Sequence, residues 1–365
     1  MNLNIVVFGL SITSSWGNGH ASTYRSLIKA LARRGHRVTF LERDVPWYRP
    51  YRDMRDPSYC RVELYRNLAD LAHFAPLVRA ADLVIQGSYV PDGIVLAEWL
   101  TSCAQGVTAY YDIDTPVTIA KLDSGEVDYI AAHLIPRFNL FLSFTGGPTL
   151  RHIEEQYGSP RARALYCAAD LDFHAPTETC NQWALGYLGT YSPDRDAALN
   201  ELLVRPATHF PEWRFVIAGA QYPDEQCWPA NIQRLEHVPP AGHAEFYAAQ
   251  RYTLNVTRAD MVARGHSPSV RLFEAAACGT PIISDHWPGI ETFFAPDDEI
   301  LIAKDAGDVA RMLSGISEER RRAIAAAARK RLRRSHTADE RAKDLEQFYL
   351  EALDQVGADV DEVVA

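Results

Sequence analysis

The sequence predicts an α/β protein with two doubly wound parallel sheets, each in a domain of its own. Short apolar, β-rich runs alternate with segments of helical length, which is the pattern of βαβ units whose sheets are covered on both faces. The alternation breaks near residue 175 and then restarts, and 365 residues suffice for about two domains. We therefore predict a first domain over residues 1–175 and a second over residues 183–335.

The individual elements follow from the apolar runs and their end signals. A helix over residues 20–34 ends at Gly35, because glycine readily adopts the left-handed conformation of a helix C-terminus. The segment 174–179 is expected to be a linker, and the chain from Ser317 onward is expected to be helical. The expected strands are residues 3–10, 37–41, 81–86, 107–112 and 138–144 in the first domain and 183–188, 214–218, 252–256 and 281–284 in the second.

Composition excludes several classes of protein. A formal net charge of -10 argues against a general nucleic-acid binder, which needs a basic surface to neutralise phosphates. The six cysteines form no CxxC pair and indicate reduced thiols rather than a disulfide framework. No signal peptide and no apolar stretch of membrane-spanning length is recognisable, so we expect a cytoplasmic protein without a membrane span.

The most informative segment runs from residue 264 to residue 285. A loop rich in serine, glycine and proline enters a helix, and Gly279 ends that helix before a buried strand. The free amides of Ser269 and Val270 would form an anion site suited to a diphosphate. Glu274, one turn further, can accept hydrogen bonds from two ribose hydroxyls; the alternative is a charge that only complements the helix dipole.

This segment resembles the nucleotide-sugar-binding core of retaining glycosyltransferases of the GT-B fold. Glu274 falls on the family's second glutamate, which binds the nucleotide ribose, whereas His266 replaces the first glutamate, which contacts the donor sugar. The residues that follow the pattern are Gly279, Pro281, Asp285, Gly289 and Glu291. Together with segments 19–25, 41–48, 267–274 and 287–291, they resemble the CgeB-like spore-maturation glycosyltransferases.

A second motif lies at the end of the strand 183–188. The family has Gly-Arg here, with a lysine five residues after the arginine, and both cations neutralise the donor diphosphate. In this chain Gly189 is followed by Thr190, and Arg195 takes the lysine position. Since a departing diphosphate needs positive charge, Arg258 or Arg271 is expected to supply the missing cation. Surface or structural roles are the alternatives for all three arginines.

The first domain offers a glycine-rich loop and an Asp-x-Asp triplet. Gly17, Asn18 and Gly19 follow the first strand, at the edge where doubly wound sheets bind ligands. His20 occupies a Gly-His position that carries the base in inverting GT-B enzymes, so it is expected to deprotonate or bind the acceptor. The pair Asp112 and Asp114 is interpreted as a strand-end turn or an acceptor contact, rather than the metal site of the other major glycosyltransferase fold.

The resemblance implies GT-B architecture, two Rossmann-like domains facing across a cleft, with the acceptor in the first and the donor in the second. A C-terminal helix over residues 336–357 would pack back on the first domain. The expected activity is hexosyl transfer from a nucleotide diphosphate sugar, with UDP favoured, to a hydroxyl of an unidentified glycan or small molecule, with retention favoured. No cofactor or metal is expected, because arginines and a helix N-terminus can offset the diphosphate charge.

The predicted site residues fall into three groups. His20, Arg195 and His266 are expected to be catalytic. The expected donor site consists of Gly189, Thr190, Arg258, Ser267, Ser269, Val270, Arg271 and Glu274, and the expected acceptor site of Gly17, Asn18, Gly19, Asp112 and Asp114. Two alternatives remain: a nucleotide-sugar epimerase of the same architecture, and a catalytically degenerate nucleotide-sugar-binding protein, which the substitutions at positions 190 and 266 make conceivable.

Overall fold

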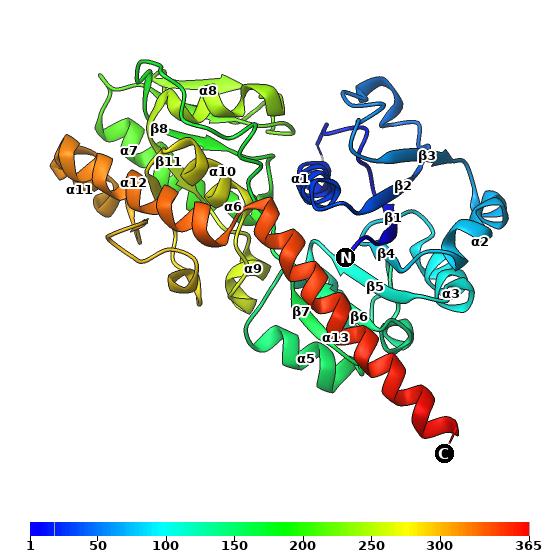
Figure 1. The fold of residues 1–365 in the computed structure, drawn as a ribbon. Helices are drawn as coiled ribbons and strands as arrows, with labels where there is room; N and C mark the ends of the chain where they lie inside the picture. Colours follow the sequence, from blue (N-terminus) through cyan, green and yellow to red (C-terminus); the bar gives the residue numbers. More distant parts are fainter. Residues whose placement is uncertain (18, 365) are drawn as a thin grey trace. The chain divides into compact units, whose positions relative to one another are not determined.

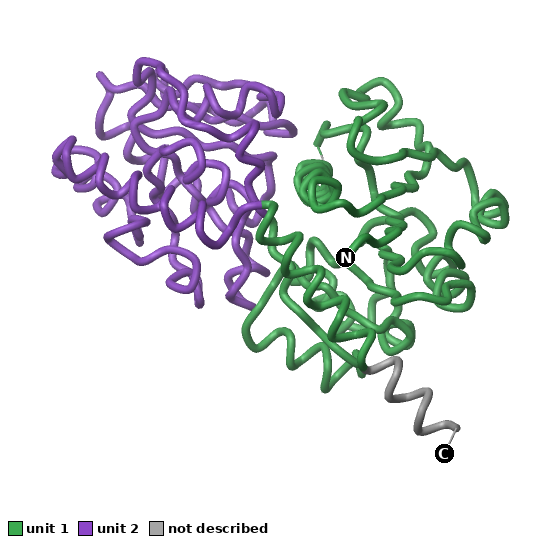
Figure 2. The backbone as a smooth tube through the Cα atoms, viewed as in Figure 1, with its two compact units in different colours: residues 1–167, 338–365 green, residues 168–337 purple. Residues whose placement is uncertain are grey.

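The computed structural model describes residues 1–17 and 19–364, with side chains up to residue 354. The chain forms two compact units, Met1–Cys167 with Ala338–Ala365, and Ala168–Thr337 (Figure 2). The first and last segments of the second unit lie next to each other, because Ala169 and Thr337 form a parallel bridge. Residues 168–182, which the sequence assigned to the first domain and a linker, therefore belong to the second unit.

The first unit is built on a seven-stranded parallel sheet with the order β3-β2-β1-β4-β5-β6-β7. Its strands are β1 Asn4–Gly9, β2 Arg37–Arg43, β3 Arg61–Tyr65, β4 Leu83–Gly87, β5 Val107–Asp112, β6 Leu140–Ser143 and β7 Ala162–Ala164. Its helices are α1 Gly19–Arg33, α2 Leu71–Arg79, α3 Gly93–Cys103, α4 Thr115–Ser124, α5 Pro148–Tyr157 and α13 Ala338–Val364 (Figure 1). The strand order reverses between β1 and β4, so the loops after these two strands lie at the switch point where doubly wound sheets bind ligands.

The second unit repeats this design with six parallel strands in the order β10-β9-β8-β11-β12-β13. Its strands are β8 Trp183–Leu188, β9 Phe215–Ala218, β10 Ile232–Leu235, β11 Gln250–Asn255, β12 Ile282–Ser284 and β13 Leu301–Ile302. Its helices are α6 Pro193–Leu199, α7 Arg205–His209, α8 His243–Ala248, α9 Ala259–Arg264, α10 Val270–Cys278, α11 Ala306–Gly315 and α12 Glu318–Ser335. The switch point lies between β8 and β11.

The predicted fold class is confirmed, and the strands that the sequence missed lie at or next to the sheet edges. Strand β3 buries only Tyr65, and β10 buries only Ile232. Such strands carry no continuous apolar run, because only the central strands of a covered parallel sheet are buried on both faces. None of the helices in the described part of the chain combines the length and hydropathy needed to cross a membrane.

A buried carboxylate fixes the loop after β1. Glu42, at the end of β2, is fully buried and accepts hydrogen bonds from the amides of Ile12 and Thr13, at 2.8 and 3.0 Å, and from the Thr13 hydroxyl at 2.6 Å. A carboxylate buried without such donors would be strongly unfavourable. The loop that leads to His20 therefore starts from a rigid base.

The last helix, α13, belongs to the first unit and packs against α1 and β5 (Figure 1). Glu346 on α13 accepts two hydrogen bonds from Arg34, at 2.7 and 2.6 Å. It also lies 2.7 Å from Nε2 of His36, whose Nδ1 accepts the Leu3 amide. The Arg34 hydrogen bonds, with a smaller effect of His36, lower the pKa of Glu346 to about 2.

We predict that Glu346→Gln destabilises the protein by about 1 kcal/mol at neutral pH, because it removes a bidentate ion pair. The carboxylate contributes fully above its unfolded pKa of 4.5, and this contribution is lost as the pH falls toward 2. Urea unfolding of both proteins between pH 7 and pH 3 measures the difference. Glu155→Gln, an exposed change on α5, is the matched control. A destabilisation that does not shrink with acidification would contradict the assignment.

Candidate functional site

The candidate site of the second unit lies at the switch point between β8 and β11. Arg271, from the first turn of α10, connects the ends of both strands. Its Nε donates to the carbonyl of Leu188 at 2.5 Å, and its Nη1 donates to Oδ1 of Asn255 at 2.8 Å. These contacts fix α10 against the carboxyl ends of the two strands, the edge at which such sheets bind ligands.

The charge of Arg271 is buried without a carboxylate partner. The residue is 6% exposed, and its guanidinium lies 4.6 Å above the ring of Tyr187, a cation–π contact. Among the described residues it forms no ion pair. A buried cation held only by neutral acceptors is a favourable neighbour for an anionic ligand.

The turn after β8 brings Arg195 to the same place. Its Nη2 donates to the Thr190 carbonyl at 2.5 Å, while its buried Nε has no hydrogen-bond partner in the described chain. Burial lowers the pKa of Arg195, and the positive charge of Arg271 lowers it further. The structure thus gathers three of the predicted donor residues, Gly189, Thr190 and Arg271, around one turn with Arg195, which was predicted to be catalytic.

This turn needs glycine at two positions. Gly219, after β9, has a φ of +147°, and a Cβ on it would lie 2.0 Å from the Gly189 carbonyl oxygen. A Cβ on Gly189 would lie 2.6 Å from the Tyr187 hydroxyl and 2.8 Å from Nη2 of Arg271. Because Gly189 and Gly219 have no side chains, the backbone of this turn can lie close to the two arginines.

Arg258, the other candidate for the missing cation, has a different environment. Its Nε lies 3.8 Å from Asp194, whose carboxylate also accepts the Ala259 amide at 3.0 Å. This carboxylate links the start of α6 to the start of α9 and offsets the charge of Arg258. Of the two candidates, Arg271 therefore lies at the turn after β8, whereas Arg258 pairs with a carboxylate.

The loop before α10 is held by its own hydrogen bonds. His266 has a φ of +46°, its amide donates to the Pro288 carbonyl at 2.7 Å, and its ring fills the space beside Gly289. Ser267 is fully buried, and its hydroxyl donates to the Gly265 carbonyl at 2.9 Å. Ser267 therefore stabilises the conformation of this loop. Ser269 is the N-cap of α10 and Val270 its first residue, both half-buried.

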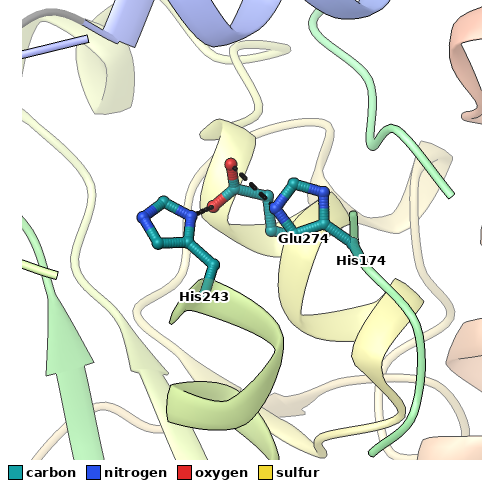
Figure 3. A group of neighbouring side chains, drawn as sticks. All are labelled: His174, His243 and Glu274. Carbon is teal, nitrogen blue, oxygen red and sulfur yellow. Dashed lines mark ion pairs between the residues drawn. The ribbon is translucent and has the colours of Figure 1, made fainter. Parts of the chain in front are cut away.

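Glu274 does not stand alone on α10, as the sequence suggested, but in a cluster with two histidines (Figure 3). Its carboxylate lies 3.6 Å from Nε2 of His174 and 3.6 Å from Nδ1 of His243, and it accepts the Tyr247 hydroxyl at 3.1 Å. Burial raises the pKa of Glu274, but His174 and His243 outweigh this and lower it to about 2. Neither histidine belongs to a recognisable motif, and His174 lies in the segment expected to be a linker.

In the first unit, Tyr89 connects two of the predicted acceptor residues. The His20 ring packs edge-on against Tyr89 with 5.5 Å between ring centroids, and the Tyr89 hydroxyl donates to Asp114 at 2.9 Å. Burial lowers the pKa of His20 to about 4, so its imidazole is neutral near pH 7. Tyr89 has a φ of +61°, which no sequence pattern indicated.

Asp112 lies beneath this group, not at the surface. It is fully buried, and its Oδ1 accepts the Asp114 amide at 3.1 Å and the Thr118 hydroxyl at 3.0 Å. Burial raises the pKa of Asp112 to about 7. It therefore positions the turn that carries Asp114, in the way expected for the strand-end turn that the sequence offered as one of two interpretations.

The glycine-rich loop carries an aromatic pair that sequence reasoning did not select. Trp16 and Tyr51 stack with 4.4 Å between ring centroids, and they remain 38% and 46% exposed. Gly17 and Gly19 beside them are exposed, and no atom lies within 4 Å of a Cβ built on either. Asn18 lies outside the described residues. An exposed aromatic face of this kind is suited to stacking on a sugar ring.

Comparisons with known proteins agree with this architecture. The family model described as "Glycosyl transferase-like" matches residues 195–347. Sucrose-phosphate synthase from Thermosynechococcus elongatus is similar at a TM-score of 0.69 and 15% identity, over 96% of this chain and 100% of that chain. An alpha-glucosyltransferase, solved in complex with UDP-glucose and DNA containing an abasic site, has a TM-score of 0.72 and 13% identity, over 96% and 100%.

HepE from Anabaena, solved in complex with UDP and glucose, has a TM-score of 0.68 and 12% identity, over 94% of this chain and 98% of that chain. No curated protein matches this chain. Likeness at this identity concerns the fold, and it confirms the two Rossmann-like domains of GT-B glycosyltransferases.

The close approach at Gly219 gives a test of the turn. We predict that Gly219→Ala costs about 2 kcal/mol or more, since the new methyl group meets a carbonyl oxygen in a strained backbone conformation. Gly315→Ala is the control: no atom lies within 4 Å of a Cβ there, and alanine in α11 is expected to change stability by less than about 1 kcal/mol. Chemical denaturation measures both, and equal stabilities of the two variants would refute the tight turn.

Proposed function

We propose that this protein is a glycosyltransferase of the hexosyl type that moves a sugar from a nucleotide diphosphate sugar, with UDP favoured, to a hydroxyl acceptor. One observation carries the proposal: Arg195 and Arg271 meet at the turn after β8, and neither forms an ion pair among the described residues. The family model over residues 195–347 covers most of the second unit, and it supports the proposal. Two of the similar structures hold UDP or UDP-glucose, which favours this donor class.

The electrostatics of the two arginines favour a diphosphate. Arg271 lowers the pKa of Arg195, so the two guanidinium groups disfavour each other's charge, and a bound dianion would relieve this repulsion. A diphosphate at Gly189 and Thr190 would also meet the start of α10, where Ser269 is the N-cap. As the sugar leaves, negative charge develops on the diphosphate, and fixed cations at that position lower the barrier.

The acceptor would bind at the switch point of the first unit. There His20 and Asp114 lie on either side of Tyr89, and the stack of Trp16, from the loop before α1, on Tyr51, from the segment after β2, supplies an apolar platform. A neutral His20 can accept a proton from a hydroxyl. Retention is favoured because the α10 segment resembles retaining enzymes, in which the donor phosphate assists attack from the face that it leaves.

We predict that Arg195→Gln weakens UDP binding about 10- to 100-fold, the value of one charge-assisted hydrogen bond, and leaves uridine binding unchanged. Calorimetric titration of both ligands measures the difference. Arg205→Gln, an exposed arginine of the same unit, is the matched control and should bind UDP normally. Equal losses for UDP and uridine, or wild-type protein that binds neither, would count against a diphosphate site at this turn.

The role of His20 separates the two stereochemical courses. With retention, His20→Ala is expected to keep turnover of the donor within about tenfold, whereas loss of a general base costs about 100- to 10,000-fold. The measurement follows UDP release from UDP-sugars with a panel of hydroxyl acceptors and determines the product anomer by NMR. A large loss with an inverted product would contradict retention. A new nucleotide sugar without UDP release would indicate an epimerase, and binding without turnover a degenerate protein.

A further inference from the structure

Three potential ligand side chains converge in the second unit from separate parts of the chain. Glu274 comes from α10, His243 is the first residue of α8, and His174 lies in the segment before β8 (Figure 3). One ligand atom from each residue lies within 4.8 Å of the other two. His174 is 7% and Glu274 4% exposed, so the group is shielded from solvent.

The hydrogen bonds of the two histidines determine which ring nitrogens carry hydrogen. Nε2 of His243 lies 3.2 Å from the Val238 carbonyl, and Nδ1 of His174 lies 3.2 Å from the Asp170 carbonyl. A carbonyl oxygen only accepts, so both of these nitrogens are donors. In the neutral imidazoles, the other two nitrogens therefore turn lone pairs toward the Glu274 carboxylate. Metal-binding histidines have this arrangement, with the distal N–H donated to a carbonyl.

The distances agree better with a shared ion than with direct hydrogen bonds. Nε2 of His174 lies 3.6 Å from Oε1 of Glu274 and Nδ1 of His243 lies 3.6 Å from Oε2, and neither nitrogen has a hydrogen-bond partner in the described chain. A charge-assisted N–H···O bond would be about 2.7–2.9 Å long. Bonds of about 2.0–2.2 Å in a tetrahedron place neighbouring ligand atoms about 3.4 Å apart, close to the observed separation.

Protonation alone leaves at least one ring nitrogen without a suitable partner or buries excess charge. Two neutral imidazoles set both lone pairs against the carboxylate, and a single imidazolium balances the carboxylate charge but leaves the other lone pair opposed to an oxygen. A divalent cation between the three groups accepts both lone pairs and the carboxylate, and an anionic fourth ligand would offset the net positive charge that remains. The Tyr247 hydroxyl orients one carboxylate oxygen from outside the ligand set at 3.1 Å, and the Tyr247 carbonyl accepts the Thr280 hydroxyl at 2.8 Å.

We propose that His174, His243 and Glu274 bind one divalent transition-metal ion of the zinc class. Two imidazoles and a carboxylate suit zinc and its neighbours, and three protein ligands leave the fourth tetrahedral position to water or to a ligand oxygen. The site departs from the metal-free donor site expected from the sequence. The proposed metal ligand Glu274 is the residue to which the family resemblance assigns binding of the nucleotide ribose. The metal-site proposal does not depend on glycosyl transfer.

The test uses Co²⁺ as a spectroscopic probe for the zinc-class ion. The full chain, freed of metal by chelation and then of chelator, is titrated with Co²⁺ in the absence of nucleotide. We expect saturation at one ion per chain, the strong visible absorption of tetrahedral Co²⁺, and its loss on addition of Zn²⁺. His174→Ala and His243→Ala should each weaken binding at least about 10- to 100-fold, the loss seen even for outer-shell partners.

His237→Ala is the matched control, since this exposed histidine lies six residues from His243 and should leave binding unchanged. Wild-type protein alone suffices to refute the site. A titration without saturation, the weak spectrum of octahedral Co²⁺, or no rise in melting temperature with Zn²⁺ would overturn it, whether or not the variants fold. Full binding in both histidine variants would do the same. Because no nucleotide is present, failure here leaves the donor proposal unaffected.

Discussion

The candidate donor site depends on the buried guanidinium of Arg271. It connects Leu188 at the end of β8, Asn255 at the end of β11 and the first turn of α10, so it fixes three elements with one side chain. Burying a cation is unfavourable unless its donors are satisfied. Here carbonyl and amide oxygens and the Tyr187 ring satisfy them, and no carboxylate forms an ion pair with Arg271 within the described chain, although Asp285 lies near enough to interact with its charge. The same contacts that stabilise the switch point thus leave it positive.

In the first unit, buried carboxylates fix the loops at the ends of the strands. Glu42 at the end of β2 binds the amides of the loop after β1, and Asp112 at the end of β5 binds the turn that carries Asp114. Both carboxylates are fully buried and act on backbone that would otherwise be free to move. The two units therefore differ in the side chains that organise these loops. The first is organised by buried acids, of which Glu42 also lies 3.9 Å from Arg52, whereas the second is organised by a buried base and suits an anion.

Much of this architecture could be predicted from the sequence, because it is encoded locally. The central strands are continuous apolar runs, Gly279 ends α10 in the left-handed conformation, and Ser317 caps α12 by accepting the Arg320 amide. The strand, turn and helix at residues 183–199 follow in sequence, and Gly189, Thr190 and Arg195 were selected there because they occupy the positions of the Gly-Arg and lysine of the family that this segment resembles. Edge strands such as β3 were missed because most of their residues are exposed or half-buried and form no continuous apolar run.

The rest depends on contacts between residues distant in sequence. The pairing of Arg258 with Asp194 spans 64 residues, and the contact of His174 with Glu274 spans 100. His174 precedes β8 in a stretch without apolar periodicity. The sequence therefore did not indicate that it contacts Glu274 on α10. Likewise, the stack of Trp16 on Tyr51 joins two loops that no motif connects. Composition and spacing define the scaffold, whereas these side-chain partners follow only from tertiary structure.

The most direct test of the central claim is a crystal structure of the protein with UDP. The account predicts that the diphosphate lies at the turn after β8, within hydrogen-bonding distance of the Arg195 and Arg271 guanidinium groups and near the first amides of α10. Diphosphate oxygens bound elsewhere in the second unit, with both arginines still held only by Thr190, Leu188 and Asn255, would contradict it.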